Sequence, residues 1–84
     1  MLYMMKKTQI MGFQVVIIPE NRSFSAWAPD IDIASQGDSI DEAIANLKEA
    51  IELHLECLTD KERKIIQDRL GKRLLTTLQV ELSA

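Results

Sequence analysis

The sequence predicts a two-layer α+β domain: a three-stranded antiparallel sheet plus a fourth C-terminal strand, with one long and one short helix packed on one face. Three observations predict it. β-Branched and aromatic residues dominate two short runs at 13–18 and 24–28, apolar residues recur with helical period over 40–58, and apolar and polar residues alternate over 74–82. The predicted order of elements is β-β-β-α-α-β, which buries both amphipathic surfaces in one core.

The length and composition are those of one small globular domain. The chain has 84 residues, of which 46% are hydrophobic and 27% charged. We expect a single domain over 1–84 with its core at 13–82, and no separate DNA-binding domain. Cys57 is the one cysteine, so no internal disulfide forms, and no apolar run suits a signal peptide or a membrane span. The predicted location is therefore the cytoplasm, away from membranes.

The first half of the sheet is predicted as a hairpin. The strand at 13–18 ends at Pro19, which cannot donate to a strand ladder, and 20–23 forms the turn. In the second strand, Phe24, Ala26 and Ala28 share one face, and Ser25 and Trp27 share the other. If the helices cover the face with Phe24, the indole of Trp27 lies on the opposite, uncovered face.

The third strand and the long helix follow a break at Pro29 and Asp30. Residues 32–36 can form a short strand before Gly37, which permits a turn. Ser39 and Glu42 have the spacing of a capping box, which predicts the start of the helix. Its predicted apolar stripe is wide, and the opposite face is acidic. The stripe consists of Ile40, Ala43, Ile44, Leu47, Ala50, Ile51, His54, Leu55 and Leu58.

A second capping box and a final strand complete the predicted elements. Thr59 and Glu62 precede a short helix over 60–70, and Gly71 is placed to end it. Over 74–82, an apolar set alternates with a polar set, which predicts a strand with one buried face. The apolar residues are Leu78, Val80 and Leu82, and the polar ones are Thr77, Gln79 and Glu81.

Charge is distributed unevenly along the chain. Residues 29–60 contain nine acids and one base, a net charge of −8, and residues 61–73 contain six bases and two acids, a net charge of +4. An acidic block attracts basic partners and repels nucleic acid. The basic block lacks aromatic residues for stacking on bases, so nucleic acid is not expected as a partner of this chain alone. Both blocks can also be solvated helix faces.

Two groups of residues could support chemistry, and each has a simpler interpretation. His54 and Cys57 are three residues apart on one helix and could form a nucleophilic pair, but a core or interface histidine and a small buried thiol are favoured. Asp30, Asp32 and Asp38 could hold a hard cation, although their spacing does not match a calcium loop and Asp38 suits a helix N-terminus. We predict no catalytic residue, no metal site and no cofactor.

The feature that remains is a surface suited to binding protein. A tryptophan on an open sheet face beside an acidic bend is typical of a binding hot spot. We predict Trp27, Asp30 and Asp32 as partner-binding residues. A small chain with a one-sided sheet also gains from pairing with itself, so a homodimer or higher homo-oligomer is expected. A contact within such an oligomer could equally cover Trp27.

The segment 24–56, FSAWAPDIDIASQGDSIDEAIANLKEAIELHLE, resembles the HicB-like antitoxins. The family pattern is a strand ending in Ala-x-x-Pro-Asp, then Ser/Thr-Gln-Gly-Asp-Ser/Thr, then Glu-Ala and a helix. With the strand at 13–18 included, the resemblance covers 13–57. The matching residues are Ala26, Pro29, Asp30, Ser35, Gln36, Gly37, Asp38, Ser39, Glu42, Ala43, Asn46, Leu47, Lys48, Glu49, Ala50 and Leu55.

The resemblance implies a partial ribonuclease-H-like fold and a non-catalytic role: binding and blocking a small basic toxin of the HicA type that cleaves mRNA. The alternative is an orphan homo-oligomeric regulatory or structural protein without a toxin partner. Many members also form dimers or tetramers and carry a C-terminal DNA-binding segment. The chain departs from the pattern at 31–34, where IDIA replaces the usual Pro-Gly-Cys turn, and it lacks an Asp within 13–18 that a nuclease would need.

Overall fold

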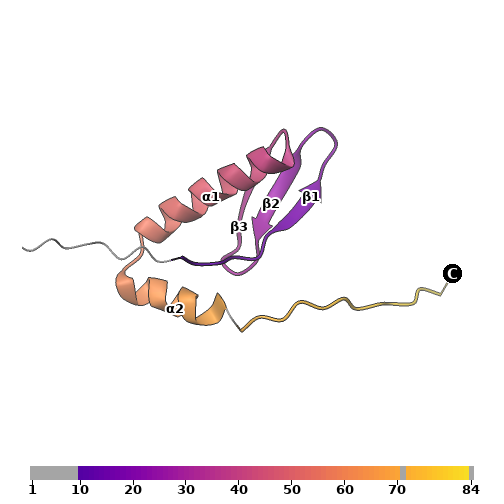
Figure 1. Cartoon of the computed structure of the whole chain (residues 1–84). Helices are drawn as coiled ribbons and strands as arrows, with labels where there is room; N and C mark the ends of the chain where they lie inside the picture. Colours follow the sequence, from indigo (N-terminus) through magenta and orange to yellow (C-terminus); the bar gives the residue numbers. More distant parts are fainter. Residues whose placement is uncertain (1–9, 71, 84) are drawn as a thin grey trace, which may run out of the picture.

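The fold consists of three strands followed by two helices. The structure is a computed structural model that describes residues 10–70 and 72–83. The strands are β1 (Val16–Pro19), β2 (Phe24–Ala28) and β3 (Ile33–Gly37), and the helices are α1 (Ile40–Glu56) and α2 (Asp60–Leu70). In Figure 1, α1 lies across the sheet and α2 turns back below it. The α+β class and the order of these five elements are as predicted.

The sheet is antiparallel throughout, with strand order β1-β2-β3. The central strand β2 pairs Trp27 with Val16 of β1 and with Ala34 of β3. One residue away, Ala26 pairs with Ile17 and Ser35. Because side chains alternate between faces, this register puts Phe24, Ala26 and Ala28 on one face and Ser25 and Trp27 on the other. The predicted hairpin and the predicted division of faces are confirmed, although the first strand begins at Val16 instead of 13 and includes Pro19.

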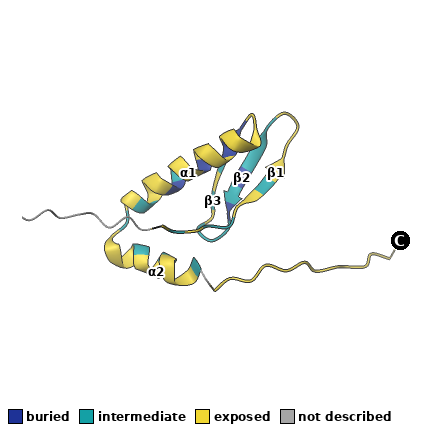
Figure 2. Cartoon of the chain, in the orientation of Figure 1, coloured by how far each residue is buried: buried dark blue, intermediate teal, exposed yellow. Residues whose placement is uncertain are grey.

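The core lies between the sheet and α1. Its buried residues are two alanines of β2 and three residues of α1, and Figure 2 shows them in dark blue where helix and strands face each other: Ala26, Ala28, Ala43, Leu47 and Ile51. The alanines allow α1 to lie close to the sheet, and Leu47 supplies the largest fully buried side chain. The buried stripe of α1 follows the spacing 43, 47, 51, 55 and is narrower than the predicted one. Ile40 and Ile44 are therefore largely exposed.

Gly37 has a different role from the predicted one. No described glycine has a positive φ, so Gly37 is not required for a turn conformation. A Cβ atom at this position would lie 2.4 Å from the backbone nitrogen of Ala43 in the first turn of α1. Beside this contact, the Asn46 side-chain amide donates to the Gln36 carbonyl oxygen at 2.8 Å. Glycine is needed because β3 and α1 approach each other too closely for a side chain.

Both helices begin at the predicted caps. The Ser39 hydroxyl oxygen accepts a hydrogen bond from the Glu42 N–H at 3.1 Å, and this bond caps α1. At α2, the Thr59 hydroxyl accepts from the Glu62 N–H at 3.2 Å, while the Glu62 carboxylate accepts from the Thr59 N–H at 3.0 Å. The second cap is a complete reciprocal box, in which two otherwise unpaired backbone donors are satisfied.

The short helix α2 does not share the covering of the sheet with α1, contrary to prediction. None of its residues is buried, and Ile65 is exposed. Its Arg63 guanidinium donates to the Leu55 carbonyl oxygen of α1 at 3.2 Å and pairs with Asp60 within α2. Seven of the eleven residues of α2 are charged, so the helix has too little apolar surface to form a second layer.

The fourth strand is not formed in the described residues. Residues 73–83 are extended but have no strand partner, and they lead away from the body of the domain (Figure 1). The Cα radius of gyration is 16.9 Å, whereas a compact chain of this length has about 12 Å. The alternation of apolar and polar residues over 74–82 determines which side chains share a face of an extended chain. It does not supply the partner strand that a β-strand needs for its backbone hydrogen bonds. The predicted helix end at Gly71 lies outside the described residues.

Candidate partner-binding site

The sheet has one face that α1 leaves uncovered, which we call the open face. Alternation and register assign six residues to it: Val16, Ile18, Ser25, Trp27, Ala34 and Gln36. Val16 and Ile18 remain 38% and 44% exposed, and Trp27 is half-buried among its neighbours. The indole therefore lies in the middle of a mainly apolar strip. No helix within residues 10–70 packs over this strip, because α1 lies on the other face and α2 buries no residue.

The bend between β2 and β3 holds the indole in place. The Trp27 indole N–H donates to the Asp32 carboxylate at 2.9 Å. Asp32 has φ 52°, in the left-handed region that aspartate and asparagine tolerate better than most residues. With its polar group satisfied and its orientation fixed, the ring presents an apolar surface that is ready for contact.

Asp30 lies inward from the same bend. Its side chain is only 4% exposed, one carboxylate oxygen lies 3.4 Å from Arg73 Nε, and the other accepts from the Gln14 N–H at 3.3 Å. This carboxylate joins the segment before β1, the bend and the start of the C-terminal segment. Within the isolated chain, Asp30 therefore supports the bend through its contacts with Gln14 and Arg73.

The structure brings the three predicted contact residues into one region but gives them different positions. Trp27 and Asp32 touch each other where the open face meets the bend, and Asp32 is exposed. Asp30 supports the bend through Gln14 and Arg73. No partner is present, so their assignment as partner contacts stays a prediction.

Glu20 is a further acidic group on the open face that sequence reasoning did not single out. Its carboxylate accepts hydrogen bonds from the Ser25 hydroxyl and from the Gln36 side-chain amide, the latter at 3.3 Å. Ser25 and Gln36 are opposite each other in the β2-β3 ladder. Glu20 could have been found only from the cross-strand pair of Ser25 and Gln36, and this pair can be identified only when the register of β2 and β3 is known. Glu20 and Asp32 put one negative charge near each end of the strip.

His54 on α1 and Cys57 at its C-cap are both exposed. The predicted buried thiol is therefore wrong, and His54 is not part of the core, whereas a histidine at an interface stays a prediction. The buried stripe passes through position 55, so His54 lies beside it, and Cys57 is at the helix end beyond the sheet. Within the described residues, no three His, Cys, Asp or Glu side chains are grouped closely enough to hold a metal ion. Asp38 precedes α1, apart from the contacts made by Asp30 and Asp32.

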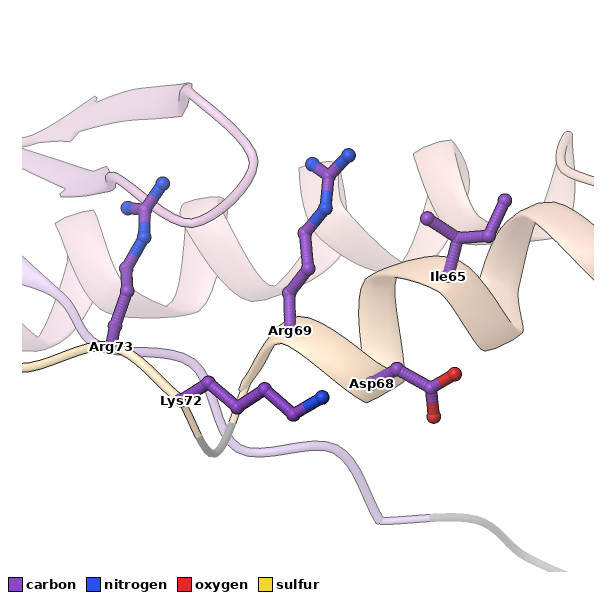
Figure 3. A pocket seen from close by; sticks show the side chains of 5 residues that line it. All are labelled: Ile65, Asp68, Arg69, Lys72 and Arg73. Atoms are coloured by element: carbon purple, nitrogen blue, oxygen red, sulfur yellow. The ribbon is translucent and has the colours of Figure 1, made fainter.

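The basic block surrounds a shallow hollow of about 430 Å³ at the end of α2. Figure 3 shows the Arg69 and Arg73 side chains extending to the same side, away from Lys72 and Asp68. Arg73 is already paired with Asp30, and Asp68 puts an acid among the bases. The hollow has no aromatic lining residue on which a base could stack.

Neither helix of the described part of the chain combines the length and the apolar character that a membrane crossing requires.

Comparison with known proteins gives one match. A family model described as the HicB-like antitoxin of bacterial toxin–antitoxin systems matches residues 13–74. The match includes all three strands, both helices and the bend that carries Trp27, Asp30 and Asp32. Searches of curated proteins and of solved structures returned no match.

Proposed function

The chain belongs to the HicB-like antitoxin family, and from this we propose that it binds and blocks a small basic toxin of the HicA type that cleaves mRNA. The open face, centred on Trp27, is the proposed binding surface. The toxin would be inhibited because the antitoxin occupies the surface that its RNA substrate needs. This proposal places the protein in the cytoplasm, together with the mRNA.

One observation carries the choice of surface: Trp27 is held in a fixed orientation on a sheet face that no described helix covers. Tryptophan is enriched among residues that dominate binding energy, especially where neighbouring contacts exclude water around it. Val16, Ile18 and Ala34 surround the indole and could supply those contacts. A fixed ring also loses little conformational freedom when a partner binds.

Charge would favour a basic partner at this surface. Glu20 and Asp32 are exposed near the two ends of the strip, and the outer face of α1 carries further exposed acids, among them Glu49 and Glu56. Complementary charge accelerates association and disfavours wrong partners more than it adds to affinity. The acids of α1 would thus attract the toxin from a distance, and those of the open face would orient it.

Inhibition by occupancy needs no catalytic group in the antitoxin. In this proposal one antitoxin site neutralises one toxin, and the protein turns over no substrate. His54 on α1 and Cys57 at its C-cap lie away from the open face and play no part in it. Asp30 contributes indirectly by holding the bend in shape through Gln14 and Arg73.

The test measures binding of a HicA-type toxin to variants of the open face, with calorimetric titration for the affinity and surface plasmon resonance for the association and dissociation rates. Trp27→Ala should weaken binding by about 2 kcal/mol or more, which is a roughly 30-fold increase in Kd. Asp32→Asn keeps an acceptor for the indole and suits the left-handed backbone, so it removes only the charge. Asp32→Gly keeps the backbone but removes the acceptor. We expect Asp32→Asn mainly to slow the association of the toxin and Asp32→Gly mainly to accelerate its dissociation.

Glu49→Gln is the matched control, because it removes one exposed acid from the far side of α1. It should leave the dissociation rate unchanged. Protection of an mRNA substrate from cleavage should follow the same order as affinity. If Trp27→Ala and Asp32→Asn bind and protect as well as the unchanged protein, the open face is not the toxin site.

A second candidate function is that of an orphan homo-oligomer without a toxin. The exposed aliphatic side chains of the C-terminal segment favour it, since an isolated chain would leave them in water. The discriminating observation is a neighbouring gene for a short basic protein with a histidine. Its absence, together with failure to neutralise any HicA-type toxin, would favour this candidate.

A further inference from the structure

An apolar groove lies along the side of α1, next to the segment that leads into β1. Its volume is about 630 Å³, and its apolar walls include Phe13, Val15, Ile44, Leu47, Ile51 and Leu55. Ile44 remains 41% exposed although its neighbours Ala43 and Leu47 are buried. The groove is thus a gap in the covering of the core, open on the side of an edge strand.

The strand beside the groove has an unpaired edge. β1 is an outer strand of the sheet, and among the described residues it pairs only with β2. Along its other edge no described strand pairs with the backbone groups of Val16, Ile17 and Ile18, so this edge can accept a further strand. An added strand with alternating side chains would place one set beneath α1, in the groove, and the other set on the open face.

The C-terminal segment has the pattern that such a position requires. Leu74, Leu78, Val80 and Leu82 fall on one side of an extended chain, and they are 72–94% exposed. Leu75 falls on the other side with Thr77, Gln79 and Glu81. Residues 74–82 have no strand partner and run away from the body of their own chain (Figure 1).

We propose that residues 74–82 of one copy add to the β1 edge of a second copy and fill its groove, while the second copy does the same in return. The result is a closed homodimer with two identical exchanged strands. The exchange covers the groove, the free edge of β1 and the exposed aliphatic side chains at once. It does not depend on whether a toxin binds the open face.

The area buried is sufficient for a stable dimer. Five aliphatic residues of each segment are exposed: Leu74, Leu75, Leu78, Val80 and Leu82. The four on the groove side, without Leu75, bury roughly 60–120 Å² of apolar surface each, or about 500–1,000 Å² in the two segments. The receiving surfaces lose a similar area, so the total is about 1,000–2,000 Å², which overlaps the range of standard protein interfaces.

The experiment is sedimentation of the full chain between about 1 and 100 µM, since assembly depends on concentration. The expected result is a dimer. Leu78→Asp with Leu82→Asp should weaken the dimer about 100-fold or more, because two carboxylates would enter an apolar groove. Thr77→Asp with Gln79→Asp is the matched control: it adds the same charge on the opposite side of the strand and should leave the dimer intact.

A second measurement identifies which chain provides the strand. In a mixture of isotope-labelled and unlabelled protein, nuclear Overhauser contacts filtered between molecules should join the Leu78 and Leu82 methyls to those of Val15 and Ile44. A monomer at all concentrations overturns the proposal, whether its segment stays free or folds onto its own β1. A dimer that persists in the Leu78→Asp, Leu82→Asp variant also overturns it. The same holds if the backbone amides of 74–82 are protected from hydrogen exchange only when a toxin is added.

Discussion

Gly37→Ala should destabilise the domain although alanine is the smallest change available. The added Cβ would lie 2.4 Å from the Ala43 nitrogen, 2.7 Å from the Glu42 carbonyl carbon and 2.9 Å from the Ala43 Cα. All three atoms belong to the backbone of the first turn of α1, so no side chain can rotate to make room. The helix start and β3 must separate by up to about 1 Å to restore ordinary contact distances.

The magnitude follows from that separation. Overpacking in a well-packed site costs about 1–3 kcal/mol, and a clash with backbone alone belongs in the upper half of that range. Moving α1 also strains the Asn46 to Gln36 hydrogen bond and loosens Leu47, the largest fully buried side chain. Replacing glycine restricts the unfolded chain and returns about 0.4–1 kcal/mol. We expect a net loss of about 2 kcal/mol in the free energy of unfolding.

Urea unfolding followed by circular dichroism measures this loss, and Gly12→Ala is the control. At Gly12 a Cβ would meet no atom within 4 Å, so the free energy of unfolding should not fall and should rise by about 0.4–1 kcal/mol from the restricted unfolded chain. Both substitutions restrict the unfolded chain to a similar extent, so they differ only in the contact with α1. If both changed the free energy of unfolding equally, that contact would carry no cost and the reasoning would be refuted. A loss at Gly37 with no loss at Gly12 assigns the cost to contact with α1.

Three further predictions concern the core, the second cap and the bend. Leu47→Ala should lower the free energy of unfolding by about 2–5 kcal/mol, measured by thermal or urea denaturation, because it leaves a cavity under α1. The Thr59 backbone N–H and hydroxyl hold the pKa of Glu62 below its ordinary value. The stabilisation of α2 by this carboxylate is therefore present at neutral pH and lost as pH falls through the lowered pKa. Helical circular dichroism should show Glu62→Gln as less helical than the unchanged protein at neutral pH but equal to it in acid. Asp30→Ala should speed amide hydrogen exchange at Gln14 and around the bend, and unchanged exchange would remove Asp30 from its organising role.

Much of the fold could be predicted from local patterns. The period of apolar residues and the capping boxes located α1 and α2, and strict alternation in β2 put Trp27 on the face away from Ala26 and Ala28. These features depend on residues a few positions apart, which is the range over which sequence patterns carry information.

What could not be predicted depends on contacts between distant segments. The burial of Asp30 follows from Gln14 and Arg73, which no local pattern connects to it. Glu20 joins the open face only because Gln36 lies next to Ser25 in the sheet. The need for glycine at position 37 likewise depends on how closely α1 approaches.

The bond between Trp27 and Asp32 has a practical consequence. The chain has a single tryptophan, so its indole emission comes from one place, and that place is the proposed docking surface. A ligand that settles over the indole would displace water from the ring and shift the emission towards shorter wavelength. The protein thus has an intrinsic optical reporter of its own occupancy, and no dye needs to be attached.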